Sequence, residues 1–244
     1  MKVKAWIPHT SLVNVMDREA DFFELFDEQR CSCSGVDILV RAQYNRITTG
    51  EHKLFESARQ SPVQTLLTIK IPRKSARPKK SKQKVRPKLP ARTAEVSVRY
   101  TQIKLNPPQY FKNKEPIPVW VIHVSEDHPP ADAKPVEWFL STTIDIKTTD
   151  DAVNCVKWYC LRWRIEDWHR VLKSGCSIED VAHKTAERLR RAIAINLVIA
   201  WRIMLMTLLG RETPKLPADV LFSDLEIEVL NAWVKKNACL LRIV

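Results

Sequence analysis

Short apolar runs, separated by polar and proline-rich breaks, predict β-strands over the first 143 residues. The first run, LVNVM, is followed directly by DREAD and then by a helical pattern over residues 20–30. Asp17 therefore stands at the carboxyl end of a strand, which is where open α/β sheets place their ligands. The predicted strands cover residues 12–16, 36–42, 67–71, 94–105, 118–124 and 137–143. The pattern is typical of an α/β protein.

From Thr148 onward, apolar residues recur with helical spacing. Thr148 and Asp151 form a Thr-x-x-Asp capping signal, and Gly175 is a helix stop, so we predict one helix of about 25 residues. A second helix is predicted from Thr185 to Leu209, ended by Gly210. A third begins at residue 223 with a Ser-x-x-Glu capping box.

The stretch YCLRWRIEDWHRVLK, residues 159–173, carries an unusual charge pattern within the first of these helices. At about 100° per residue, one side of the helix gathers an apolar stripe, which we expect to be buried: Leu161, Ile165, Trp168 and Leu172. On the opposite side we predict an exposed edge that aligns a phenol, a guanidinium, a carboxylate and an ammonium: Tyr159, Arg162, Glu166 and Lys173. Such an edge is either a solvated face or a site that handles phosphate chemistry.

The most apolar segment is AIAINLVIAWRIMLMTLL, residues 192–209. Its length approaches that of a membrane span, but Asn196 and Arg202 interrupt it. A helix that is apolar nearly all round is more often buried in a protein core, so we expect this segment to be a core helix, with a membrane span as the alternative. The N-terminal residues MKVKAWIPHTSL lack the apolar core of a signal peptide.

Charge indicates the class of partner. Among 244 residues, Lys and Arg exceed Asp and Glu by 12, and the sequence pI is about 9.5. This balance favours a polyanion, chiefly nucleic acid, with an acidic membrane surface as the second possibility. Half of residues 73–92 are Lys or Arg and none is acidic. We expect this loop, and in particular Lys79, Lys80 and Lys82, to contact a phosphate backbone, although it also has the composition of a solvated linker.

The cysteines argue against a zinc site. Six occur, none in a C-x2-C pair and none beside a histidine cluster. Reduced thiols in a cytoplasm are the simplest interpretation.

The spacing Y-x2-R-x3-E-x6-K, filled by Tyr159, Arg162, Glu166 and Lys173, together with DREAD upstream, resembles the signatures of DDE transposases of the insertion-sequence-four, transposon-five-like group. The resemblance extends from about residue 10 to about residue 235. It implies an RNase H-like α/β fold with a β-strand insertion and a helical C-terminal region. The corresponding segments are residues 1–60 for a partial core, 61–146 for the insertion, 147–182 for the catalytic helix and 183–244 for the C-terminal region.

The resemblance also implies roles for individual residues. Asp17 and Glu166 correspond to catalytic carboxylates that bind Mg²⁺ or Mn²⁺, and Trp138 corresponds to a tryptophan that stacks on an extruded base. The residues that correspond to phosphate contacts at the transposon end are Tyr159, Arg162, Lys173 and, more loosely, Arg41. For Arg18, Glu19 and Asp21 a capping role is an equal alternative to chemistry. Double-stranded DNA is the implied partner. The resemblance also implies that the C-terminal helices form a homodimer, or a heterodimer with an intact transposase. The alternative role for these helices is packing within the monomer.

The family pattern includes a first aspartate well upstream of DREAD, whereas the sixteen residues that precede Asp17 contain neither Asp nor Glu. We therefore expect an incomplete transposase that lacks the first strands of its sheet. Two alternatives to an active enzyme remain open. One is a catalytically dead remnant that binds DNA or dimerises and inhibits an intact transposase, and the other is a remnant that folds poorly because its sheet edges are exposed.

Overall fold

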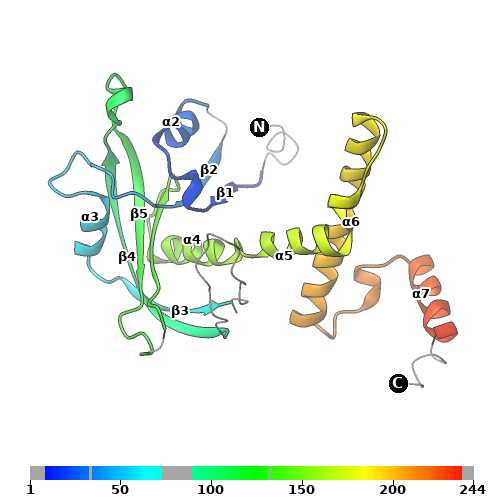
Figure 1. Ribbon diagram of the computed structural model, residues 1–244. Helices are drawn as coiled ribbons and strands as arrows, with labels where there is room; N and C mark the ends of the chain where they lie inside the picture. The colour runs from blue at the N-terminus through cyan, green and yellow to red at the C-terminus, as the bar shows by residue number, and fades with distance from the viewer. Residues whose placement is uncertain (1–8, 33–34, 73–89, 132, 238–244) are drawn as a thin grey trace. The chain divides into compact units, whose positions relative to one another are not determined.

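The computed structural model describes residues 9–32, 35–72, 90–131 and 133–237. The chain divides into two compact units, residues 1–162 (unit 1) and residues 163–244 (unit 2). Each unit is described by itself below (Figure 1).

Unit 1 is built on a mixed sheet of six strands among the described residues, in the order β1-β2-β6-β5-β4-β3. β1 and β2 are parallel, and every other neighbouring pair is antiparallel. All six predicted strands are confirmed, with ends that differ by at most two residues. Their bounds are β1 Leu12–Met16, β2 Val36–Arg41, β3 Thr65–Ile71, β4 Arg92–Leu105, β5 Ile117–Ser125 and β6 Glu137–Thr142. The strands predicted between residues 61 and 146 thus join β1 and β2 in one sheet.

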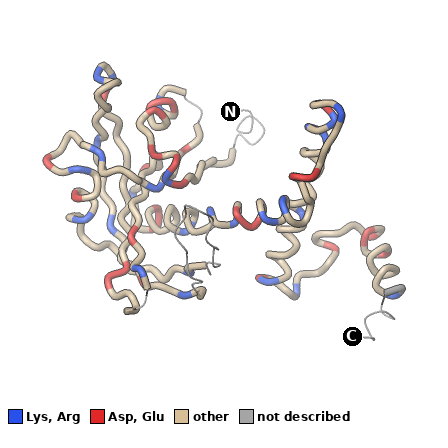
Figure 2. The backbone as a smooth tube through the Cα atoms, in the orientation of Figure 1, with Lys and Arg blue, Asp and Glu red and all other residues tan. Residues whose placement is uncertain are grey.

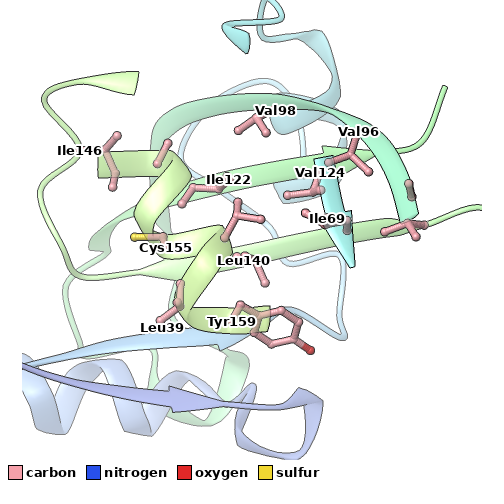
Figure 3. Packing of buried hydrophobic residues seen from close by; sticks show 14 residues of the cluster. Leu39, Ile69, Val96, Val98, Ile122, Val124, Leu140, Ile146, Cys155 and Tyr159 are labelled. Atoms are coloured by element: carbon pink, nitrogen blue, oxygen red, sulfur yellow. The ribbon is translucent and has the colours of Figure 1, made fainter. Parts of the chain in front are cut away.

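Helices cover both faces of this sheet. On one face α4, Thr149–Leu161, buries Cys155, Val156 and Tyr159 against Leu39, Leu140 and their neighbours (Figure 3). On the other face, α2, Phe23–Ser32, and α3, Leu54–Gln60, bury a second apolar cluster against the strands. The alternation of side chains along each strand supplies both clusters, because successive residues point to opposite faces. The helix α3 was not predicted from the sequence.

The predicted helix of about 25 residues is divided in the structure, so that prediction is wrong. The Thr148–Asp151 capping box is present and starts α4, but α4 ends at Leu161. The amides of Arg162 and Glu166 then donate to the carbonyls three residues earlier, those of Tyr159 and Trp163. This tightening interrupts the regular i→i−4 pattern of an α-helix. A separate helix, α5, covers Arg164–Arg170 and is followed by a π-helical turn, Val171–Gly175.

Unit 2 consists of helices. Its longest, α6, runs over Ala186–Glu212, begins with a Thr185 cap and continues past Gly210, where the sequence predicted its end. The helix α7 covers Asp224–Asn237, and the amide and hydroxyl of Ser223 donate to the Glu226 carboxylate, which confirms the predicted capping box. The Arg202–Glu226 ion pair of 2.6 Å joins α6 to α7.

The prediction that residues 192–209 form a buried core helix is wrong for unit 2 as described. Of the residues of α6, all of which are described, Ala200 alone is buried. α6 is long and apolar enough to cross a membrane, but core helices of soluble proteins can have the same length and apolar composition. The apolar stripe predicted for residues 159–173 is also only partly buried: Leu172 is buried, whereas Leu161 and Ile165 are exposed.

Candidate active site at the carboxyl ends of β1 and β2

Four elements of unit 1 end at the same edge of the sheet. Because β1 and β2 are parallel, with Met16 opposite Val40, one edge of the sheet carries both Asp17, which follows β1, and Arg41, the last residue of β2. β6 is antiparallel to β2, so the N-terminal end of β6, which carries Trp138, lies at that edge. The last residues of α4 reach the same place from the helix face of the sheet, as contacts with Trp138 and Asp17 show.

Asp17 occupies the turn after β1. Its Oδ1 accepts a hydrogen bond of 3.1 Å from the amide of Glu19, which caps the short 3-10 turn Arg18–Ala20. Its Oδ2 lies 3.7 Å from Nη1 of Arg162, and the two side chains are 47% and 15% exposed respectively. The structure therefore brings together two residues that the sequence separates by 145 positions, and it leaves the carboxylate accessible to solvent.

An aromatic base supports the cationic side chains. The ring of Trp138 meets the edge of Tyr159 with a centroid distance of 5.2 Å, and the guanidinium of Arg41 lies 5.7 Å from the Trp138 centroid. The guanidinium of Arg162 lies 5.9 Å from the Tyr159 centroid. Such cation–π contacts add about 0.5–2 kcal/mol and restrict the side chains to one orientation.

Tyr159 corrects the sequence-based prediction of an exposed phenol. It is 1% exposed and belongs to the core cluster between α4 and the sheet, with its hydroxyl at the rim of that cluster (Figure 3). The reason is tertiary: α4 turns this side of the helix, with Cys155 and Val156, towards the strands. The hydroxyl is a polar end on an apolar body, and it hydrogen-bonds the Arg41 side chain.

The electrostatics of this edge are cationic. Burial lowers the pKa of Arg41, the contact with Tyr159 opposes that shift, and the charges of Arg18 and Arg162 lower the pKa further. A guanidinium nevertheless keeps its proton in proteins. Arg41 thus lies within electrostatic range of Arg18 and Arg162, and Arg162 also faces the Asp17 carboxylate, an arrangement that suits an incoming anion such as a phosphate group. Elsewhere in unit 1 the two signs are interspersed, with acidic residues gathered on α2 (Figure 2).

Asp21, the second aspartate of DREAD, has a different role from Asp17. It is 4% exposed, and its Oδ2 accepts hydrogen bonds from the amides of Gln43 and Tyr44 at 2.7 and 2.9 Å. Its Oδ1 accepts a third, of 3.0 Å, from Nε of Arg46. These bonds fasten the turn after β1 to the loop after β2, so Asp21 is committed to structure. Sequence reasoning could not find Arg46, because its partner lies 25 residues away.

The remaining predicted site residues of the helical motif lie in unit 2. Glu166 is an exposed residue in the first turn of α5. Lys173 lies in the π-helical turn, where its Nζ is 2.7 Å from the Glu179 carboxylate. That hydrogen bond and charge raise the pKa of Lys173, so its ammonium form is stabilised. The predicted DNA contacts Lys79, Lys80 and Lys82 lie outside the described residues.

A divalent metal ion needs several oxygen ligands in one place. Asp17 fits one such position, since it ends a strand and is half exposed. Over residues 9–32, 35–72, 90–131 and 133–237, however, no group of three or more His, Cys, Asp or Glu side chains is gathered as a complete ligand set. Asp21 cannot complete one, because its carboxylate oxygens accept from Gln43, Tyr44 and Arg46.

The chain also matches a known protein family. Residues 15–202 match the sequence profile of the transposase DDE domain, a span that includes Asp17, strands β2 to β6 and the helical motif with Glu166. The family has an RNase H-like α/β fold, which the mixed sheet with helices on both faces fits. DNA is the substrate of this family. Since the match covers more than half of the 244 residues, the chain belongs to the DDE transposase family.

Proposed function

We propose that the chain acts on transposon ends as a DDE transposase of the insertion-sequence-four, transposon-five-like group, which cleaves DNA and transfers the cut strand. The observation that carries the proposal is the cluster at the ends of β1 and β2. There an accessible carboxylate, Asp17, lies 3.7 Å from Arg162, and Arg41 and Arg162 rest on Trp138 and Tyr159. The spacing of Tyr159, Arg162, Glu166 and Lys173 supports the assignment to this group.

In this proposal Asp17, at the end of β1, and Glu166, in α5, are each catalytic carboxylates that bind the metal. Bound Mg²⁺ or Mn²⁺ would activate an attacking hydroxyl and stabilise the leaving oxygen. The hydrogen bond that the Glu19 amide donates to Oδ1 orients the Asp17 carboxylate before any ligand arrives.

The arginines position the DNA rather than perform chemistry. Arg41 and Arg162 present their guanidinium groups from an aromatic base, and each can bind a phosphate through two parallel hydrogen bonds. Lys173 adds a point charge from the π-helical turn. Trp138 is half buried against Tyr159, which leaves part of its ring for an extruded base.

A second candidate function is DNA binding without cleavage. The described residues gather no complete metal-ligand set, and Asp21 is committed to Arg46. In this second candidate function, the chain binds DNA and associates with a second copy of itself or with an intact transposase. Association with the intact transposase inhibits that enzyme. Both candidates place the protein in the bacterial cytoplasm, on nucleoid DNA, with double-stranded DNA as its partner.

One experiment separates the two candidates. The full chain is incubated with end-labelled transposon ends in Mg²⁺ or Mn²⁺, beside the Glu166→Gln and Asp17→Asn variants and an Arg191→Gln control from an exposed ion pair. Cleavage that both variants abolish, and the control keeps, supports the enzyme. Binding without cleavage in every sample supports the second candidate. Absence of both binding and cleavage contradicts the whole proposal.

The basic stretch, residues 73–92, has its own test. Each phosphate neutralised contributes about −0.9 to the slope of log affinity against log salt for duplex DNA. Replacing Lys79, Lys80 and Lys82 by Gln should therefore make the slope about 2–3 units shallower. Fluorescence anisotropy over a series of salt concentrations measures it. An unchanged slope would identify the stretch as a linker that does not touch DNA.

A further inference from the structure

A group of exposed aromatic rings lies beside the turn that carries Asp17. Phe22, Tyr44 and Tyr110 are 44%, 57% and 71% exposed, although rings of this size are usually at least partly buried. We define them as the ring surface. None of the three has a role in the metal, phosphate or tryptophan contacts described above.

Arg46 joins the members of the ring surface. Its guanidinium lies 5.7 Å from the Tyr44 centroid, and its Nε is bonded to Asp21, the residue before Phe22. The hydroxyl of Tyr110 hydrogen-bonds Glu24, and its pKa is raised by desolvation and by that carboxylate, while the nearby charge of Arg46 opposes the shift. One guanidinium therefore lies within electrostatic reach of both tyrosines.

The ring surface is held in place before any ligand binds. The side chain of Arg46 is 18% exposed and that of Asp21 is 2% exposed, and Asp21 also accepts the amide of Tyr44. Tyr110 packs on Phe111 with a centroid distance of 5.0 Å, and Phe111 contacts Phe23 of the core. A tyrosine with two side-chain torsions loses little entropy on binding when its backbone is already fixed.

The chemistry around the rings is that of a nucleic-acid surface. Beside Tyr110 lies an open pocket of about 300 Å³, at the small end of the range for ligand sites, whose lining includes the amides of Gln109 and Asn113 and the ammonium group of Lys112. The ammonium of Lys114, also in the lining, is paired with Asp27 at 2.9 Å. Amides can hydrogen-bond base edges, and ammonium groups can bind phosphates. Rings interleaved with cations are the arrangement by which proteins stack unpaired bases.

We propose that the ring surface binds unpaired bases of a single DNA strand, with Tyr44 and Tyr110 as the stacking residues. Resting on the proposed function, this strand is the one that continues past the phosphate held at Asp17, since Asp21 ties that turn to the Tyr44 loop. Stacking suits any base, because every base has a π-face, so the surface would hold a strand without choosing its sequence.

The test compares single-stranded and duplex DNA on the full chain. Anisotropy with labelled oligothymidylate and with a duplex of equal length gives both dissociation constants at one salt concentration. Stacking contributes about 1–3 kcal/mol per base, so Tyr44→Ala should weaken oligothymidylate binding about ten-fold and Tyr110→Ala by a similar factor. The affinity for the duplex should change less than two-fold.

Two controls separate stacking from general effects. Tyr44→Phe keeps the ring and should stay within two-fold of the parent protein. Ile47→Ala removes an even more exposed apolar side chain, at 63%, from the same loop, and should also have no effect. Circular dichroism confirms folding for each variant.

The outcomes distinguish this inference from the proposed function. If the duplex is bound but Tyr44→Ala and Tyr110→Ala bind oligothymidylate like the parent, the inference is wrong and the proposed function stands. If Ile47→Ala weakens oligothymidylate binding as much as Tyr44→Ala, the loss does not depend on an aromatic ring and the inference is wrong. If the parent protein binds oligothymidylate through its rings but does not bind the duplex, the inference is supported and the proposed function is contradicted. If the parent protein binds neither oligothymidylate nor the duplex, the inference and the proposed function are both contradicted.

Discussion

The two units of the chain bury their side chains to very different extents. In unit 1 two apolar clusters fill both faces of the sheet, whereas in the described part of unit 2 only Leu172 and Ala200 are buried. The helix α7 exposes Leu225, Val229 and Trp233 by 59% or more. A strand must find its partner elsewhere in the sequence, so a sheet forms together with its core. A helix satisfies its own backbone hydrogen bonds, so it can form while many of its side chains remain exposed.

This contrast indicates what stabilises each unit. Unit 1 depends on long-range packing, while unit 2 as described depends on caps and ion pairs close in sequence or on neighbouring helices. Three pairs of substitutions, each with one member in each unit, test this contrast.

The largest difference is expected for apolar truncation. Phe26 is fully buried under the sheet, so Phe26→Ala should lower the free energy of unfolding of unit 1 by about 3–5 kcal/mol. Leu225 is 70% exposed, so Leu225→Ala should change stability by less than about 0.5 kcal/mol. Hydrogen exchange of the full chain, resolved by segment, measures both. A large effect at Leu225 would show that α7 packs on a partner.

A smaller difference is expected for ion pairs. Glu126, 3% exposed at its side chain, accepts two hydrogen bonds from Arg92, at 2.5 and 2.8 Å, and this pairing lowers the pKa of its carboxyl group. Arg92→Met should cost about 2 kcal/mol. The Arg191–Glu187 pair of α6 is more than 70% exposed on both sides, so Arg191→Met should cost less than about 0.5 kcal/mol. Equal costs would contradict the contrast.

The Glu126 pair also predicts a pH dependence. Because its pKa is lower in the folded than in the unfolded state, the pair stabilises unit 1 above the unfolded value, about 4.3, and this contribution is lost as pH falls through the folded pKa. Glu126→Gln should flatten the acid limb of the stability curve. A limb as steep as in the parent protein would assign the acid sensitivity to other carboxyl groups.

The smallest difference concerns the two capping boxes. Thr148→Ala and Ser223→Ala each remove one hydroxyl that caps a helix, at a cost of about 1 kcal/mol. In α4 this cost should appear in the global unfolding of unit 1, because α4 is part of its core. In α7 it should appear only as faster exchange in the first turn. Loss of protection throughout unit 2 after Ser223→Ala would show that α7 supports the other helices.

The sequence predicts the elements of unit 1 better than their contacts. Alternating apolar residues gave all six strands, since each side of the sheet has its own core. The helix α3, Leu54–Gln60, was missed because seven residues are too few to establish a helical period. The junction at Arg162 was missed because each flanking segment is a good helix on its own.

For the candidate site, residue types were easier to predict than environments. Asp17, Arg41, Trp138, Tyr159 and Arg162 do meet at one edge of the sheet, although their roles in catalysis and DNA binding stay predictions. Periodicity places a residue on a side of a helix but does not tell which side faces the core, and so it assigned the phenol of Tyr159 to solvent. The partners of Asp21 depend on a loop that follows another strand, which no local pattern reveals.

Because its ring is buried, Tyr159 is constrained both by the packing of the core and by the role of its hydroxyl at the site. Any replacement that lacks the ring opens a void between α4 and the sheet, so a mutational scan of the stretch will score this position like a core residue. Arg162, at 15% exposure on the rim, is expected to tolerate replacement by other long side chains as far as folding is concerned. Within one four-residue signature, intolerance at the tyrosine therefore records the architecture, and intolerance at the arginine records the chemistry.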